Sequence, residues 1–206
     1  ASILCSEILL CSVEDNSFVC VLSCINLINW DELKDTDAIE TLIYFLDAVN
    51  EKFIQKSEGV KFMEKANNFA KNQRALGMGV MGWHHYLQSK MIAFESIEAQ
   101  MLNIGIFKTL KERTDKASKE LAVLFGEPPL LVGYGERNVT KMSLPPTTSS
   151  SFYMGQGSQS IEPEPAVYYI QRSAKGSFSV KNPYFEELLK SKDKNTKDVW
   201  DSILLK

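Results

Sequence analysis

A thiol and a carboxylate stand two positions apart near the start of this 206-residue sequence, at Cys5 and Glu7. The apolar residues around them predict an extended segment, in which side chains two apart point to the same side. A thiol there could act as a nucleophile or radical carrier, with the carboxylate as general base. The alternative is a buried cysteine beside a surface carboxylate, because a cysteine is usually a small core residue.

Three further cysteines follow, at Cys11, Cys20 and Cys24. We expect Cys20 and Cys24 on the same side of a second extended segment. The spacings and apolar flanks of the four cysteines fit a structural zinc site poorly, because such sites pair their cysteines across tight turns. Stable disulfides are disfavoured in a cytoplasmic chain, whereas a transient catalytic disulfide is not.

Two adjacent histidines, His84 and His85, raise the possibility of a metal site or an acid/base pair. Adjacent helical side chains point about 100° apart, so these two cannot readily bind one ion together. The neighbours Trp83 and Tyr86 indicate a packed helix, and we interpret both histidines as structural. A Cys/His hydrolase built on Cys5 and His84 is a minor alternative that rests on residue types alone.

The segment PPTTSSS, residues 145–151, concentrates hydroxyl groups and backbone N–H groups where a strand is expected to end. If a helix or turn follows, these donors converge and make an anion site. The alternative is a solvated Ser/Thr linker. The segment is not a Walker loop, because it contains no Gly-Lys-Ser/Thr.

The composition is that of a soluble globular protein, with 23 Lys+Arg, 26 Asp+Glu and 44% hydrophobic residues. It disfavours disorder, a collagen-like chain and a basic nucleic-acid binder. The longest uncharged run, residues 16–30, is too short for a membrane span, and the opening residues lack the basic start of a secretory signal. We therefore expect a cytoplasmic protein with neither nucleic acid nor membrane as a partner.

The elements that would position these groups follow from periodicity. Residues 1–30 predict two buried extended segments joined by a polar turn, and a helix starts at Asp37, which can form a capping box with Glu40. Three glycines within residues 77–82 indicate close packing against a neighbouring backbone. The remaining predicted elements are a helix over 60–72, a long amphipathic helix over 97–124 ended by Gly126, β-like segments at 138–144, 167–171 and 177–181, and short helices at 184–190 and 198–205 capped by Asn182 and by Asn195 or Thr196. This order suggests an α/β layout with ligand loops at strand ends.

Five motifs occur along the chain: LCSEI at 4–8, VCVLSCINL at 19–27, RALGMGVMGWHHYL at 74–87, LPPTTSSS at 144–151 and SIEP at 160–163. In their residues and in their order along the chain, these motifs resemble the large catalytic subunit of ribonucleotide reductase. The resemblance covers nearly the whole chain. The resemblance implies a ten-stranded α/β barrel with a finger loop, here at the N-terminus, that carries the radical cysteine. We expect a single partial catalytic barrel domain over residues 1–206. Its parts are strands and finger loop at 1–30, a helical part at 36–126, the phosphate loop and later strands at 138–181, and C-terminal helices at 183–205.

The resemblance also implies roles for individual residues. Cys5 matches the thiyl radical that removes hydrogen from ribose C3′, and Glu7 matches the group that accepts the 3′-hydroxyl proton. Cys20 matches one half of the reducing dithiol, whose partner has no counterpart in this sequence. Cys11 and Cys24 match no catalytic position and are expected in the core.

The hydroxyl segment matches the loop that holds the substrate phosphates, through Thr147, Thr148, Ser149 and Ser150. Two positions depart from the family pattern. Ile3 stands where the family has an asparagine whose amide bonds the substrate hydroxyls, and an apolar side chain cannot supply that contact. Pro146 replaces a serine or threonine and removes a hydroxyl and an N–H.

The resemblance further implies a ribonucleoside-diphosphate substrate, a missing N-terminal part of the large subunit, a radical-generating small subunit, and thioredoxin or glutaredoxin. No cofactor is expected on this chain itself, because the radical comes from a separate metal-containing subunit; adenosylcobalamin is the less favoured source. The chain opens beside the radical cysteine without a methionine, so we expect part of a split or interrupted subunit, active only when complemented. The alternative is an inactive remnant or an assembly module.

Overall fold

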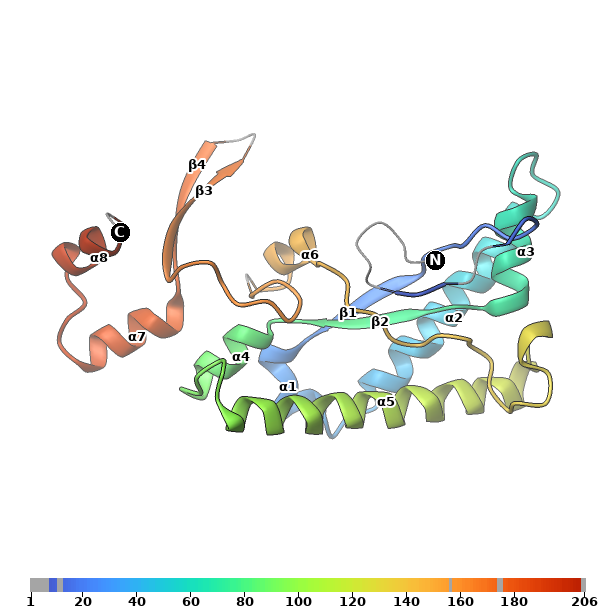
Figure 1. Ribbon diagram of the computed structural model, residues 1–206, viewed down its shortest axis with the longest axis horizontal. Helices are drawn as coiled ribbons and strands as arrows, with labels where there is room; N and C mark the ends of the chain where they lie inside the picture. The colour runs from blue at the N-terminus through green and yellow to red at the C-terminus, as the bar shows by residue number, and fades with distance from the viewer. Residues whose placement is uncertain (1–7, 11–12, 156, 174–175, 205–206) are drawn as a thin grey trace.

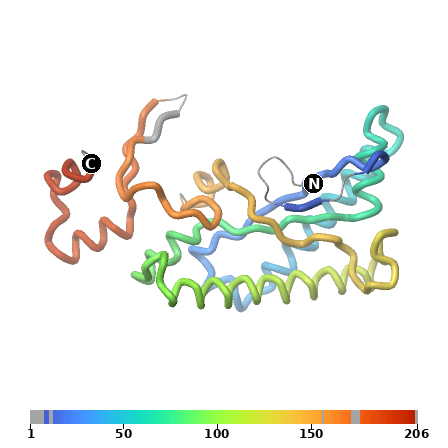
Figure 2. The backbone as a smooth tube through the Cα atoms, in the orientation of Figure 1, coloured from blue at the N-terminus to red at the C-terminus, as the bar shows by residue number. Residues whose placement is uncertain are grey.

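A computed structural model describes residues 8–10, 13–155, 157–173 and 176–204 of the chain (Figure 1). Cys5, Glu7 and Cys11 lie outside these ranges. The described part contains a pair of parallel strands flanked by helices, followed toward the C-terminus by a hairpin and two short helices (Figure 1, Figure 2). Across the described residues, no helix combines the length and the apolar character that crossing a membrane requires.

The parallel pair consists of β1 (Leu22–Asn26) and β2 (Gly77–Met81), with Cys24 opposite Gly79. Parallel neighbours need a long crossover connection, and the helices between the two strands supply it. All five residues of β2 are buried. This burial explains why β2 carries no charge and has glycine at two of its five positions.

The segment that leads to the hydroxyl loop runs along the other edge of β2. The Met78 N–H donates to the Lys141 carbonyl at 2.8 Å, and the Ser143 N–H donates to the Met78 carbonyl at 3.0 Å. A parallel bridge between Met78 and Met142 completes this pairing. The β-like segment predicted at 138–144 therefore pairs with β2, although only as a single bridge.

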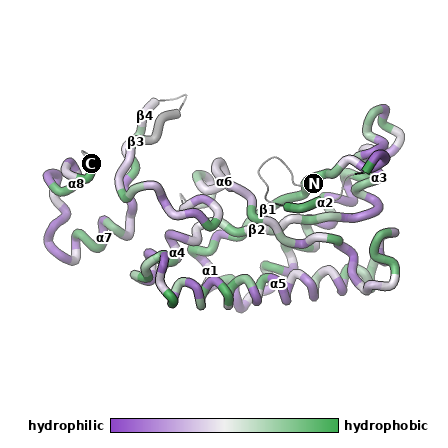
Figure 3. Tube along the Cα trace, in the orientation of Figure 1, coloured by the Kyte–Doolittle hydropathy of each residue, from purple (hydrophilic) through white to green (hydrophobic). Residues whose placement is uncertain are grey.

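Helices α2 (Ala38–Ser57), α3 (Glu64–Gln73) and α5 (Ile97–Phe125) carry most of the helical content, and α2 and α5 pack directly against each other. Hydrophobic and hydrophilic residues alternate along α5 in Figure 3, as the predicted amphipathic helix requires. The apolar faces of α2 and α5 join the strands in one core. Its fully buried members include Leu27, Ile39, Ile43, Leu76, Leu87, Leu110 and Ala117.

Short elements connect and extend this core. They are η1 (Leu27–Asn29), α1 (Trp30–Leu33), α4 (Trp83–Ser89), η2 (Pro129–Leu131), α6 (Thr148–Tyr153), β3 (Tyr168–Ser173), β4 (Gly176–Lys181), α7 (Pro183–Ser191) and α8 (Lys197–Leu204). β3 and β4 correspond to the predicted β-like segments at 167–171 and 177–181, and they pair as an antiparallel hairpin. Asn182 caps α7 by accepting a hydrogen bond from the Phe185 N–H at 3.0 Å, as predicted.

The glycines of β2 allow the close packing that the sequence predicts. A Cβ on Gly77 would lie 2.4 Å from Leu22 Cδ2, and one on Gly79 would lie 2.2 Å from Pro145 Cδ. Neither distance is possible for a side chain. The glycines are therefore required because β1 and the segment leading to the hydroxyl loop press on β2 from both sides.

One sequence prediction in the first part of the chain is wrong. Asp37 stands at the N-cap of α2 but makes no side-chain capping bond, and Glu40 pairs with Arg113 of α5 in place of capping. The guanidinium of Arg113 offers Glu40 a stronger hydrogen bond than a backbone amide does.

Of the first predicted extended segment, the structure describes residues 8–10. Ile8 and Leu10 are buried there, whereas Leu9 is 75% exposed.

A buried ion cluster ties α2 to the strands. Asp47 of α2 is 6% exposed and accepts hydrogen bonds from Arg74 Nε at 3.0 Å, Arg137 Nε at 2.9 Å and Asn138 Nδ2 at 3.0 Å. Burial by itself would raise the pKa of Asp47, but the bonds from Arg74 and Arg137 outweigh it and hold the pKa below its usual value. The cluster joins three segments that are far apart in the chain.

Candidate functional site

The hydroxyl loop is anchored at the carboxyl end of β1. Asn26, the last residue of β1, donates from Nδ2 to the Met154 carbonyl at 2.8 Å and accepts the Ile28 N–H at 3.1 Å. A Cβ on Gly82, which follows β2 with φ 78°, would lie 2.6 Å from Asn26 Oδ1. The strand ends therefore hold the last turn of α6 through one asparagine side chain and a glycine that leaves room for it.

The start of the loop is closed by a bond between two residues in left-handed conformations. Thr147 has φ 51° and Ser160 has φ 46°, and the Thr147 Oγ1 accepts the Ser160 N–H at 2.8 Å. Both residues are buried. A β-branched residue in this region is strained, and such strain persists where the surroundings hold it in place, often at functional sites.

The four predicted phosphate-binding residues thus fall into two groups. Thr147 is buried and its hydroxyl already accepts a bond, whereas Thr148 and Ser149 are exposed and Ser150 is half-buried at the start of α6. The Thr148 hydroxyl donates to Gln159 Oε1 at 3.3 Å. The structure therefore leaves the hydroxyls of Thr148 and Ser149 accessible, next to backbone N–H groups of a first helical turn, which have no partner within the helix.

The two described cysteines differ in environment. Cys20 is exposed and stands two residues before β1, whereas Cys24 lies half-buried within β1. Burial raises the pKa of the Cys24 thiol, so it stays protonated and unreactive at neutral pH. In the described ranges, no group of three or more His, Cys, Asp or Glu side chains gathers as metal ligands would.

The two histidines contact different groups, as their divergent directions on α4 require. His84 Nδ1 accepts the Glu164 N–H at 2.8 Å. His85 is buried, with its Nε2 3.2 Å from Asn182 Nδ2 and 3.7 Å from Glu164 Oε1. Burial lowers the pKa of His85 to about 4, so the ring is neutral at physiological pH. The predicted structural role agrees with these contacts, yet His85 also faces a cavity.

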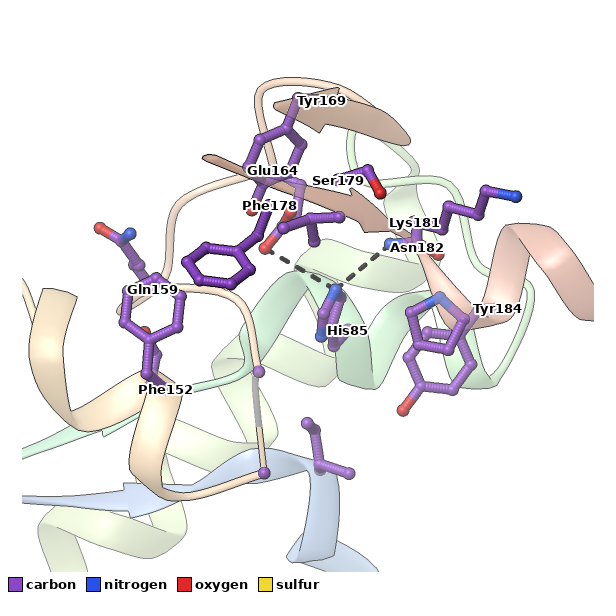
Figure 4. Close-up of a pocket in the computed structure, with 16 residues that line it drawn as sticks. His85, Phe152, Gln159, Glu164, Tyr169, Phe178, Ser179, Lys181, Asn182 and Tyr184 are labelled. Atoms are coloured by element: carbon purple, nitrogen blue, oxygen red, sulfur yellow. Dashed lines mark hydrogen bonds and ion pairs between the residues drawn. The ribbon is translucent and has the colours of Figure 1, made fainter. Parts of the chain in front are cut away.

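This cavity of about 660 Å³ lies beside α6 and beneath the hairpin (Figure 4). Its lining includes His85 and Asn182 together with aromatic side chains from α6, the hairpin and α7. Glu164 also lines it, and its side chain is 13% exposed. Sequence reasoning missed this site, because its residues come from segments as far apart as Ile28 and Tyr184 and carry no motif. The available signal was the clustering of aromatic residues after the SIEP motif.

The comparisons with known proteins agree with this geometry. A family model described as ribonucleotide reductase, barrel domain, matches residues 1–130 and 129–206. The chain belongs to this ribonucleotide reductase family. The prediction that it carries the α/β fold of the reductase barrel is thereby confirmed.

Individual members of the reductase family match almost the whole chain. The sequence is 39% identical over 203 residues to the ribonucleoside-diphosphate reductase large subunit of Invertebrate iridescent virus 6, covering 97% of this chain and 21% of that protein. A corresponding large subunit of Invertebrate iridescent virus 3 is 35% identical, with 97% and 32% covered.

A solved structure supports the same assignment. The class Id ribonucleotide reductase alpha subunit of Actinobacillus ureae is 52% identical, with a TM-score of 0.91 over 98% of this chain and 37% of that one. The chain therefore spans between about a fifth and two fifths of the length of these reductase relatives.

Proposed function

We propose that this chain supplies the radical cysteine and the substrate-phosphate loop of a ribonucleoside-diphosphate reductase large subunit. The observation that carries the proposal is the 52% identity to a class Id alpha subunit across 98% of the chain, at a TM-score of 0.91. The residues required for the chemistry occur in the expected order at Cys5, Glu7, Cys20 and residues 147–150. The product would be deoxyribonucleotides for DNA synthesis.

Cys5 and Glu7 would carry out the first steps of the reaction. A thiyl radical on Cys5 takes the hydrogen atom from ribose C3′ and becomes a thiol. Glu7 accepts the proton of the 3′-hydroxyl while the 2′-hydroxyl, protonated by a thiol of the reducing pair, leaves as water. A carboxylate can serve as this base only when it lies within hydrogen-bond reach of the hydroxyl, which the two-residue spacing in an extended segment would permit.

Cys20 would supply half of the reducing power. With a second thiol it delivers two electrons and two protons to the ribose and forms a disulfide, which thioredoxin or glutaredoxin then reduces. The exposure of Cys20 immediately before β1 supports this role, because a thiol that exchanges with a disulfide must be accessible. Cys24, which lies within β1, is less accessible, and burial raises its pKa.

The hydroxyl loop would hold the diphosphate. Thr148, Ser149 and Ser150 would donate hydroxyl and backbone hydrogen bonds to the phosphate oxygens, as their positions at the start of α6 favour. Thr147, with its hydroxyl accepting the Ser160 N–H, would act by positioning the loop. This division of roles refines the expectation that all four residues bind phosphate alike.

The radical would come from a separate metal-containing small subunit, because the structurally similar alpha subunit belongs to class Id of these enzymes. An adenosylcobalamin-dependent arrangement is the less favoured source. The remaining part of the large subunit would complete the barrel beside β1, whose outer edge carries no strand among the described residues.

A second candidate function rests on Ile3. This residue stands where the family has a substrate-binding asparagine. The substitution favours an assembly module or inactive remnant that binds its partner chains without turnover.

Reduction of cytidine diphosphate tests these alternatives. The assay would combine the chain with the segments that complete a large subunit, a radical-generating small subunit and dithiothreitol. We expect turnover that Cys5→Ser abolishes and that the matched Cys24→Ser change leaves intact. Absence of turnover in a stable assembly would favour the assembly module, and Ile3→Asn would then show whether the missing amide is the defect.

A further inference from the structure

The cavity beside α6 has aromatic walls and a carboxylate. Phe152 of α6, Phe178 and Tyr169 of the hairpin and Tyr184 of α7 contribute rings to its lining (Figure 4). Its volume of about 660 Å³ lies within the range of small-molecule pockets. Aromatic faces carry partial negative charge and attract cations that lie over them. The walls therefore favour a ligand with a positively charged, weakly hydrated end.

The carboxylate of Glu164 strengthens this preference. Burial raises the pKa of Glu164, and a hydrogen bond from Tyr169 offsets part of that effect. In the described part of the chain, its ion-pair contact is with His85 Nε2 at 3.7 Å, and His85 is neutral because its own pKa is lowered to about 4. Thus neither neighbour supplies a positive charge.

The basic residue of the lining does not supply that charge either. Lys181 lies on the cavity border, but its Nζ sits 4.6 Å from the ring centre of Trp200 and 5.5 Å from that of Tyr168. Figure 4 shows the Lys181 side chain extending away from Glu164. A largely desolvated carboxylate without a cation is costly, so a positively charged ligand would relieve that cost.

We propose that this cavity is a binding site for an organic cation, an alkylguanidinium or alkylammonium group, held between the Glu164 carboxylate and the aromatic walls. The Glu164 oxygens accept its N–H groups, and the rings of Phe152 and Phe178 cover its apolar stem. An anion such as a nucleotide phosphate is disfavoured there, because Glu164 repels it. The proposal is independent of the proposed reduction chemistry.

Calorimetric titration of the full chain tests the site with three probes of one shape. These are n-butylguanidinium, n-butylammonium and the uncharged n-butylurea. We expect both cations to bind and the urea to bind about tenfold more weakly or not at all, because it lacks the charge that Glu164 and the rings attract. Equal binding of n-butylurea, or no binding of either cation, would overturn the proposal.

Two variants and one control separate the contributions. Glu164→Gln keeps the shape of the side chain and should lower the affinity for n-butylguanidinium about tenfold or more. Phe178 is 55% exposed, so Phe178→Leu should leave the fold intact. This variant should lower the affinity for n-butylguanidinium severalfold. Glu162→Gln, an exposed carboxylate two residues away, should leave affinity unchanged. If Glu164→Gln and Phe178→Leu both bind as the wild type does, the proposal fails.

The cation could come from a free metabolite or from an arginine or lysine side chain of a polypeptide. A blocked Gly-Arg-Gly peptide distinguishes these sources. Binding at least tenfold tighter than n-butylguanidinium would assign the site to a polypeptide side chain, because the peptide adds backbone contacts at the rim. Equal or weaker binding would assign it to a small free cation.

Discussion

Two carboxylates, the buried Asp47 in the strand core and the half-buried Glu164 beneath the hairpin, have opposite surroundings. Asp47 is 6% exposed and receives hydrogen bonds from two arginines and an asparagine, so its pKa is held low. Glu164 is 13% exposed, it contacts the neutral groups His85 and Tyr169 within the described residues, and burial raises its pKa. Folding therefore neutralises the charge of Asp47 and leaves that of Glu164 without a cation among the described residues.

The two regions also differ in how closely they are packed, and the strand core is the more closely packed of the two. Around β2 the backbone is so close to its neighbours that Gly77 and Gly79 cannot be replaced without movement. Beneath the hairpin, a cavity of about 660 Å³ separates α6 from β4. The strand core is thus built for rigidity, whereas the region under the hairpin retains space.

The largest expected effect comes from breaking the buried ion cluster around Asp47. Asp47→Ala leaves Arg74 and Arg137 buried without their acceptor, and we expect a loss of about 3–5 kcal/mol in the free energy of unfolding. Urea denaturation followed by circular dichroism measures it. As a control, Glu58→Ala removes a carboxylate that is 67% exposed and paired with Lys71, and should cost less than about 1 kcal/mol. Similar losses for both variants would contradict the comparison.

A smaller effect tests the tight packing at β2. Gly79→Ala places a methyl group against Pro145 and the Ser143 carbonyl, and should cost about 1–3 kcal/mol. Gly105→Ala in α5, where a Cβ meets no atom within 4 Å, should instead stabilise the chain by up to about 1 kcal/mol. Thermal unfolding of both variants measures the contrast. A stabilising Gly79→Ala would show that the strands have room to separate.

The smallest effect concerns the pH dependence of Glu164. Because its folded pKa lies above the usual 4.5, the folded chain binds more protons, and stability falls as pH rises through that window. Glu164→Gln should therefore gain up to about 1 kcal/mol relative to the wild type between pH 4 and pH 7. Denaturation at several pH values measures this slope.

The contribution of His85 has the opposite sign. Its pKa falls from 6.5 to about 4 on folding, so its contribution to stability is lost as pH falls through this range. Because His85 Nε2 lies 3.7 Å from Glu164 Oε1, the two titrations are coupled, and Glu164→Gln is therefore also compared in a His85→Asn background. A difference that stays flat with pH would show that Glu164 titrates as an exposed carboxylate does.

Much of the secondary structure could be predicted because its signals are local. The repeat of apolar residues that ends at Gly126 predicts α5, and Asn182 with Pro183 predicts the start of α7. The hairpin follows from two β-like runs around Gly176. Each of these signals lies within the element that it specifies.

The candidate site could be predicted only in part. The hydroxyl segment was found from its composition and the family resemblance, but the burial of Thr147 and its bond to Ser160 were not, because they depend on a backbone closure across 13 residues. Likewise, the proton state of His85 depends on burial under Asn182, which lies 97 positions away. The proposed roles of Cys5, Glu7 and Cys20 come from the resemblance and remain predictions.

The family, the order of the motifs and the elements with local periodicity can be read from the sequence. Which charges are matched follows only from the folded chain: Glu40 pairs with Arg113, Asp47 pairs with two arginines, and Glu164 meets no cation within the described residues. The two kinds of feature differ in the range of the interactions behind them. Helix periodicity and capping act over a few residues, whereas the pairing and desolvation of a charge depend on side chains that only folding brings together.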